Sequence, residues 1–337
     1  MGSRFFSKVQ FCKEGTRGTA VAADTLLLGR IPAVGTDRTP VFPREDVGVN
    51  APAVRAVIHQ YLYSNTLSIE HGYFQALPWI FGCGLKGGVS ASEANVGQGD
   101  YEWNLTPSLS AANSPDSLTI ELGDDTQAFE TEYAMFERIR LSWTVAQGQD
   151  ASPVGIEADF FGRQLSPTSF TSGISIPTVE PLNGKLSRMY VNSAWADVGT
   201  TEKTNILRGA DIEILTGVHP KFAGSANKYF NSYGEGLIEV TANVTLEGNS
   251  DADAIFDAQQ AGTFQVLRFA INGGQIGSGD NHMVTVDIGG YWESVSPLGS
   301  EDRNDNLHSG VFRGVAVDVS GTMKMLAVNV TTNVSAY

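Results

Sequence analysis

The chain has 337 residues, of which 42% are hydrophobic and 18% charged, and its formal net charge is −15. A chain of this length buries roughly three-quarters of its unfolded surface, so its core needs no disulfide framework, and Cys12 and Cys83 are too few to make one. The acidic balance argues against tight non-specific binding of nucleic acid, which requires Lys and Arg to neutralise phosphates. No apolar run approaches the roughly 18 residues of a membrane span, and none near residue 1 is long enough for a signal peptide. We therefore expect folding in a reducing cytosol without membrane insertion.

Apolar and alternating runs in the first half predict strands. One short buried helix is predicted among them, because Phe74, Leu77 and Phe81 are spaced by three and four residues. It is expected to end at Gly82. The predicted strands of this half cover residues 9–11, 19–28, 53–63, 101–105, 118–122, 135–145 and 154–160.

Residues 30–50 form a long irregular segment, rich in Pro and Gly, in which Arg30, Arg38 and Arg44 make a locally basic stretch. One interpretation is a solvated loop. The other is an arm that contacts a neighbouring subunit, because long loops without regular structure in compact domains are usually functional. Its prolines lower the entropy cost of ordering on contact.

The second half begins after residues 166–184, whose Ser, Thr, Gly and Pro content favours a linker. Residues 238–247 then alternate apolar and polar side chains, which predicts a half-buried strand with one polar face in water. Ser250 is the expected N-cap of the following helix, and Gly262 its C-terminal cap. The predicted strands of this half cover residues 185–191, 206–215, 238–247, 264–271, 282–288, 311–319 and 323–330.

A strand followed by a short helix occurs in both halves, which indicates an internal duplication. Strands outnumber helices throughout. The sequence therefore predicts a mainly β protein with two tandem β-sandwich or barrel domains, residues 1–175 and 176–337, each with a short flanking helix.

Groups that carry catalysis or bind metals are not combined in any recognisable pattern. The histidines are scattered without zinc spacing, and no nucleotide-binding glycine motif is complete. Residues 302–306 begin like a calcium loop, but Leu307 stands where glycine is required and Arg313 where the bidentate glutamate belongs. We expect no catalytic residues, no cofactor and no metal, and hence no enzyme.

Several runs of the sequence resemble the tail tube proteins of long-tailed bacteriophages, in the form that has two fused tube domains. They are Tyr-Glu-Trp-Asn-Leu-Thr-Pro-Ser at 101–108, Pro-Asp-Ser-Leu-Thr-Ile-Glu-Leu-Gly-Asp-Asp-Thr-Gln-Ala at 115–128, Ala-Asp-Phe-Phe-Gly-Arg-Gln at 158–164 and Lys-Glu-Gly-Thr-Arg-Gly-Thr-Ala-Val at 13–21. The order of strand, helix and return strand is similar too. None of these runs is a catalytic signature.

This resemblance implies a structural virion protein, made in the cytoplasm of a host bacterium and assembled into the phage tail. Three copies are expected to form a ring, and rings to stack around a channel through which double-stranded DNA passes without specific binding. The implied partners are further copies of the chain, the tape measure protein, the tail terminator and the distal tail proteins.

The channel-lining candidates are acidic residues on the polar faces of predicted strands, since carboxylates repel phosphates. Glu239 and Glu247 are eight residues apart and so point to the same side of one strand, about 27 Å from each other. Asp287 and Glu121 are the candidates on other strands. A soluble β-sandwich binding module and a capsid decoration protein remain the alternatives, because both can be acidic and rich in threonine.

Overall fold

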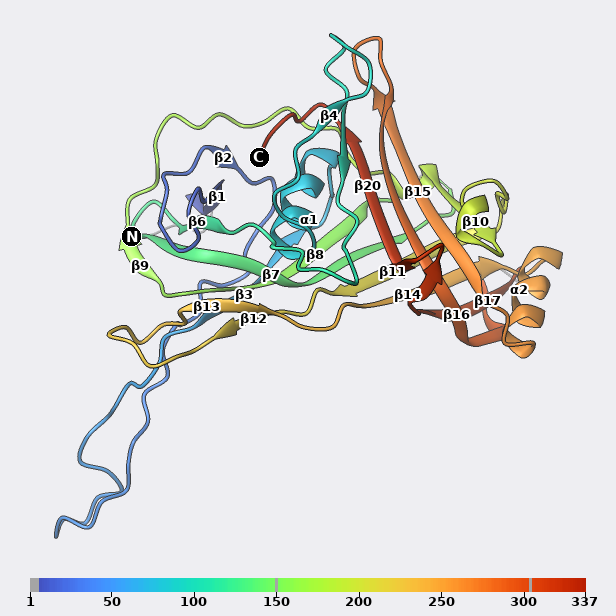
Figure 1. The fold of residues 1–337 in the computed structure, drawn as a ribbon. Coiled ribbons are helices and arrows are strands. Elements are labelled where there is room, and N and C mark those ends of the chain that lie inside the picture. The colour runs from blue at the N-terminus through green and yellow to red at the C-terminus, as the bar shows by residue number, and fades with distance from the viewer. Residues whose placement is uncertain (1–5, 149–150, 303–304) are drawn as a thin grey trace.

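The computed structural model describes residues 6–148, 151–302 and 305–337, which form a mainly β structure with long antiparallel strands (Figure 1). The two α-helices are α1 (Leu77–Gly84) and α2 (Ser250–Gln260), and the short 3-10 turns are η2 (Phe74–Ala76), η3 (Gly184–Leu186) and η4 (Trp195–Asp197). The strands of the first half are β1 (Lys8–Lys13), β2 (Thr25–Leu26), β3 (Tyr63–Ile69), β4 (Ser92–Glu93), β5 (Tyr101–Asn104), β6 (Leu118–Gly123), β7 (Ala128–Thr144), β8 (Val154–Gly162) and β9 (Ser166–Thr168). Those of the second half are β10 (Ser187–Asn192), β11 (Leu207–Leu215), β12 (Val218–Lys221), β13 (Ser232–Glu235), β14 (Glu239–Glu247), β15 (Gln265–Gln275), β16 (Asn281–Asp302), β17 (Asp305–Gly314), β18 (Val317–Val319), β19 (Thr322–Lys324) and β20 (Leu326–Thr332).

One sheet runs through both halves of the chain. Its central path is β3–β8–β7–β11–β14–β17–β16, and every pairing along it is antiparallel. The hairpins β12–β13 and β18–β19 form small sheets of their own. The halves are joined where β7 pairs with β11, so they share a continuous ladder of backbone hydrogen bonds.

The long strands β7 and β16 each take part in two layers. The first part of β7 pairs with β6 and β9, and its second part with β8 and β11. The first part of β16 pairs with β15 and β20, and its second part with β17. In each strand the register shifts by one residue where the layers separate, at Glu137 and at Glu293. Such a bulge bends a strand and increases its twist, which directs the two parts of the strand into different layers.

The pairing order is the same in the two halves of the chain. The order β1–β6–β7–β8–β3 of the first half recurs as β10–β15–β16–β17–β14 in the second. The helices α1 and α2 occupy matching places after β3 and β14. This recurrence agrees with the duplication expected from sequence, while a division near residue 175 stays a prediction.

Helix α1 lies inside the molecule, with all of its residues buried. Its Trp79 packs between Phe11, at 4.3 Å between ring centroids, and Phe136, at 6.0 Å. Pro78 lies in its first turn, where a missing N–H costs nothing. Helix α2 buries only Ala252 and Ile255 and lies at one end of the sheet.

Five local predictions were wrong. Two of them were single strands that the structure divides, 311–319 into β17 and β18, and 323–330 into β19 and β20. The N-cap of α2 is Asn249, not Ser250, because the Asn249 side chain accepts hydrogen bonds from the N–H groups of residues 251 and 252. Residues 53–62 form irregular chain, and the strand predicted there begins only at Tyr63. Most of 19–28 is also irregular, with β2 limited to two residues.

Candidate functional site

The central sheet has one apolar and one polar face. Along β14, Val240, Ala242, Val244 and Leu246 are buried, and the residues between them point to the other side. The polar face, as defined here, consists of the side chains that project to this second side. These are Ser64, Thr66, Ser68, Glu157, Asp159, Glu137, Arg138, Arg140, Ser142, Thr144, Arg208, Asp211, Glu213, Leu215, Glu239, Thr241, Asn243, Thr245, Glu247, Asp305, Leu307, Ser309, Val311, Arg313, Tyr291, Glu293, Ser294 and Ser296. Met135 and Phe161 lie on the same side but are buried against Phe230, so they are not counted in the polar face.

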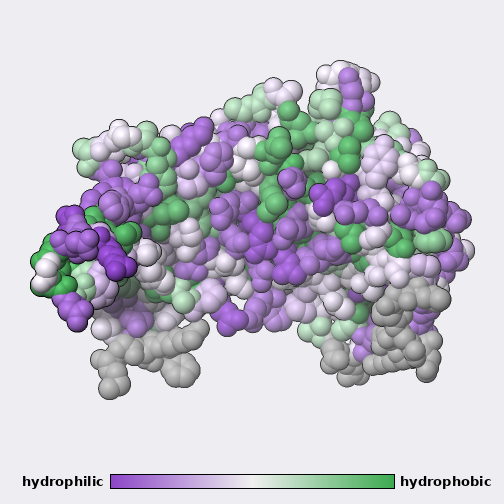
Figure 2. All heavy atoms as spheres, turned by 90° about the horizontal axis from the view of Figure 1, so that it is seen from below, coloured by the Kyte–Doolittle hydropathy of each residue, from purple (hydrophilic) through white to green (hydrophobic). Residues whose placement is uncertain are grey.

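Part of the polar face is hollowed. A depression of about 750 Å³ crosses β7, β11, β14, β17 and β16, and Ser142, Asn243 and Ser309 are among its lining residues. Seen from below, hydrophilic residues gather across the middle of the molecule (Figure 2). The surface is therefore concave, lined by many polar residues and built on strands rather than on loops.

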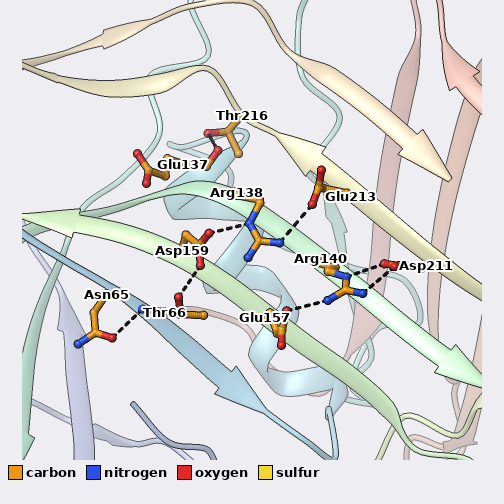
Figure 3. A network of polar contacts seen from close by, with 10 residues as sticks. All are labelled: Asn65, Thr66, Glu137, Arg138, Arg140, Glu157, Asp159, Asp211, Glu213 and Thr216. Atoms are coloured by element: carbon orange, nitrogen blue, oxygen red, sulfur yellow. Dashed lines mark hydrogen bonds and ion pairs between the residues drawn. The ribbon is translucent and has the colours of Figure 1, made fainter. Parts of the chain in front are cut away.

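Arginines on β7 are each held between two carboxylates from the neighbouring strands (Figure 3). Arg138 donates to Asp159 on β8 at 2.6 Å and to Glu213 on β11 at 3.2 Å. Arg140 donates to Glu157 at 3.1 Å and, through two nitrogens, to Asp211 at 2.7 Å. The paired register places these residues directly opposite or diagonally across adjacent strands, which is the reach of long side chains.

The acid–arginine contacts shift the pKa values of the groups involved. Hydrogen bonding to Asp211 raises the pKa of Arg140, and hydrogen bonding to Asp159 raises that of Arg138. Partial burial of Asp159 opposes ionisation, but hydrogen bonds from Arg138 and Thr66 outweigh it, so the Asp159 pKa lies below its ordinary value. These shifts favour the ionised forms of Arg138, Arg140 and Asp159.

The other arginines of the polar face are also paired. Arg208 forms ion pairs with Glu247 and, at 3.6 Å, with Asp305, and Arg313 pairs with Glu293 at 2.9 Å. The polar face as defined carries four arginines and nine carboxylates, so its formal charge is 4 − 9 = −5. Each guanidinium is already engaged, which leaves the surplus charge negative.

Two of the four acidic residues predicted to line a channel lie on this face. Glu239 is exposed and Glu247 is half-buried beside Arg208, both on β14 as the alternation required.

Glu121 and Asp287 were assigned wrongly, because both are buried, at 2% exposure each. Glu121 on β6 accepts hydrogen bonds from Gln10 and from the backbone and hydroxyl of Thr171. Burial alone raises its pKa, but these hydrogen bonds lower it below the ordinary value. Asp287 is held by two nitrogens of Arg268, at 2.6 and 2.7 Å. Neither carboxylate faces open solvent. Thr171, from the segment after β9, contacts Glu121, and Arg268 of the neighbouring strand β15 holds Asp287.

The segment predicted as an arm projects from the body in Figure 1, below the sheet and beside β12 and β13. Arg30 pairs with Glu70, and Arg38 pairs with Asp37 at 2.8 Å and lies 4.5 Å from the Tyr61 ring centroid. These two arginines are thus engaged within their own chain, and Arg44 is exposed.

The exposed apolar residues of the arm were missed from the sequence. Among them, Phe42 is 65% exposed, and Val41, Val47 and Val49 are 50–55% exposed; Val54, just after the arm, is 50% exposed. The signal was the presence of β-branched and aromatic residues within a Pro-rich loop. The Arg138 and Arg140 network was missed as well, although these residues alternate with Ile139 and Leu141 in the sequence, a pattern that places both arginines on one face of a strand.

No group of three or more His, Cys, Asp or Glu side chains arranged for a metal occurs among the described residues. Within the same part of the chain, no helix combines the length and apolarity needed to cross a membrane. The chain matches no protein-family model, and no curated protein is significantly similar to it.

Proposed function

We propose that this chain is a non-enzymatic building block of a bacteriophage tail tube, with two tail-tube-like domains at 1–175 and 176–337. Three copies form a ring, and stacked rings enclose a channel for double-stranded DNA. The observation that carries the proposal is the continuous antiparallel sheet with a concave, net acidic face. The sequence runs that resemble tail tube proteins supply the link to phages.

The polar face has the electrostatics that a DNA conduit needs. A channel that bound phosphates would hold its cargo, so its wall must repel them or stay neutral. The arginines of this face are compensated by carboxylates at 2.6–3.6 Å, so none of them offers an unpaired charge. Three copies carry 3 × (−15) = −45 formally, and salt screens the resulting repulsion beyond roughly 10 Å.

The arm at 30–50 and its continuation to residue 60 serves assembly. Exposed valines and Phe42 on a projecting segment are costly in water and suit burial against another subunit. Glu239 and Glu247 face the channel, and Arg44 remains available for an acidic neighbouring surface. The tape measure protein, tail terminator and distal tail proteins are the further partners, the virion is the final location, and no cofactor is needed.

A sugar-binding module is not favoured by the described residues. Such modules place aromatic rings on an open face, whereas all five tryptophans are buried, at 2–8% exposure. Tyr291 is the aromatic residue of the polar face as defined above. A decoration protein has no specific observation in its favour.

Electron microscopy of the purified protein at increasing concentration tests the proposal. Rings of three chains and smooth hollow tubes are expected. A protein that stays monomeric up to millimolar concentration, and is absent from tubes of particles that contain it, would overturn the proposal.

A further inference from the structure

The two halves of the chain differ in whether their sheet edges are occupied. In the first half, the second part of β7 is paired on both sides, with β8 and with β11. In the second half, the matching part of β16, from Tyr291 onward, pairs with β17 on one side. Its other side has no strand among the described residues. Such an edge is a template for pairing with another chain.

The strand that would complete this edge has a counterpart in the first half. Strand β11 precedes β14 and pairs with it, with Gly209 opposite Thr245. The matching bridge beside β3 joins Arg30 to Ser68. Residues 30–36 therefore occupy the place of β11 in the first half, and no strand lies on their outer side among the described residues.

Resting on the proposed function, we propose that residues 30–36 of one copy pair with β16 of a second copy, as β11 pairs with β7 within the chain. The contact inside the molecule is then the template for the contact between molecules. Repetition of this contact joins further copies head to tail, and the rotation that it imposes decides whether the assembly closes into a ring.

The register follows from the shared bulges. Glu137 and Glu293 are equivalent, so Arg140 corresponds to Ser296. Gly209 and Arg30 are also equivalent, so Glu213, four residues after Gly209, corresponds to Val34, four residues after Arg30. Since Arg140 lies opposite Glu213, Ser296 of one copy is expected opposite Val34 of the next. By the same reasoning, Ser294 is expected opposite Thr36.

The equivalence of the two halves also predicts where the arm of one copy lies on the next copy. Between β11 and β14 the chain forms the β12–β13 hairpin, whose Phe230 is fully buried beneath the first half, 5.0 Å from Tyr133 and 5.4 Å from Phe161 between ring centroids. Met135, beside them, is fully buried too, whereas its counterpart in the second half, Tyr291, is 38% exposed.

The part of the arm after residue 36 lies between residues 30–36 and β3, as the hairpin lies between β11 and β14. It therefore carries its exposed valines and Phe42 beneath the second half of the neighbouring copy, against Tyr291. This contact buries apolar surface on both copies.

Disulfide trapping in mixtures tests the pairing. One protein carries Val34→Cys and the other Ser296→Cys, each with Cys12→Ser, while the fully buried Cys83 is kept. The matched control replaces Ser309, which lies opposite Ser296 on β17. That position is one strand farther from the junction, roughly 9–10 Å from Val34, beyond the ~7 Å Cα separation that a disulfide tolerates.

Mild oxidation of the mixed proteins is expected to give covalent dimers with Ser296→Cys, at least about tenfold more than with Ser309→Cys. Circular dichroism verifies that each variant is folded, and Thr36→Cys with Ser294→Cys repeats the test in the same register. Equal trapping at residues 296 and 309, or none at either, overturns the pairing.

The outcomes separate this inference from the function on which it rests. Tubes that form without the Ser296 cross-link overturn the pairing and leave the tube proposal intact. Cross-linked oligomers that never build tubes support the pairing and count against the tube.

Discussion

Arg140 offers the sharpest test of the polar face, because removing its carboxylates exposes a cation without deleting it. In the variant Glu157→Gln with Asp211→Asn, both side chains keep their shape, and the face changes from −5 to −5 + 2 = −3 per chain. The pairs are about one-third exposed, so their loss costs stability on the order of 1 kcal/mol or less each. The protein is expected to stay folded and to assemble.

The freed guanidinium becomes a phosphate ligand. In a ring of three copies, three new contacts add a salt slope of about −0.9 each, or about −2.7 in total. Raising the salt from 50 to 200 mM then weakens this added DNA binding by about 40-fold. Fluorescence anisotropy of a short labelled duplex with assembled protein measures the slope.

The matched control adds Arg140→Gln to the same two changes, which removes the cation and is expected to abolish the new binding. If the double variant binds no DNA at 50 mM salt, or binds as tightly with Gln at 140 as with Arg, the reasoning about compensated arginines is refuted.

Three further predictions concern stability and assembly. Phe230→Ala removes a fully buried ring and is expected to lower the free energy of unfolding in urea by about 3–5 kcal/mol. Phe42→Ala, at a 65% exposed position, is expected to change that free energy by less than about 0.5 kcal/mol and yet to impair assembly. Equal losses of stability in the two variants would contradict the assignment of these residues. Glu121 has a folded-state pKa below its ordinary 4.5, so its ionisation stabilises the fold above that pH, and this contribution is lost as the pH falls through the folded-state pKa; thermal melts of Glu121→Gln should therefore depend less on pH between 5 and 3 than those of the unmodified protein. Replacement of residues 39–58 by a short Gly-Ser linker should leave the melting temperature of the monomer nearly unchanged and block tube formation in electron micrographs, and normal tubes would show that the arm is only a loop.

Local periodicity predicted much of the sheet because alternation is a property of neighbouring residues. Strand β14 and the helix after it were found in this way, and so was the shared side of Glu239 and Glu247. The short α1 was found from three apolar residues and a glycine. These features depend on contacts within one element.

Contacts between residues far apart in the sequence could not be predicted from local periodicity. Alternation places Glu121 and Asp287 on the polar sides of strands, but it cannot show that Thr171 and Arg268 hydrogen-bond to them and that both carboxylates are buried. The pairing of β7 with β11 joins residues about 70 positions apart, and no local pattern specifies it. The acid–arginine network follows from that pairing, so it could be recognised only in the structure.

Strand β5 has a consequence for synthesis of the chain. Its ladder is completed by β20, more than 200 residues later, and the Trp103 indole N–H donates to the carbonyl of residue 334 at 2.8 Å. While the ribosome is still making the second half, Trp103 has neither this cover nor this hydrogen-bond partner. The first half therefore stays incompletely folded until nearly the last residues leave the ribosome. A chain that ends near residue 175 is expected to be bound by chaperones or degraded by proteases rather than to form a stable fragment.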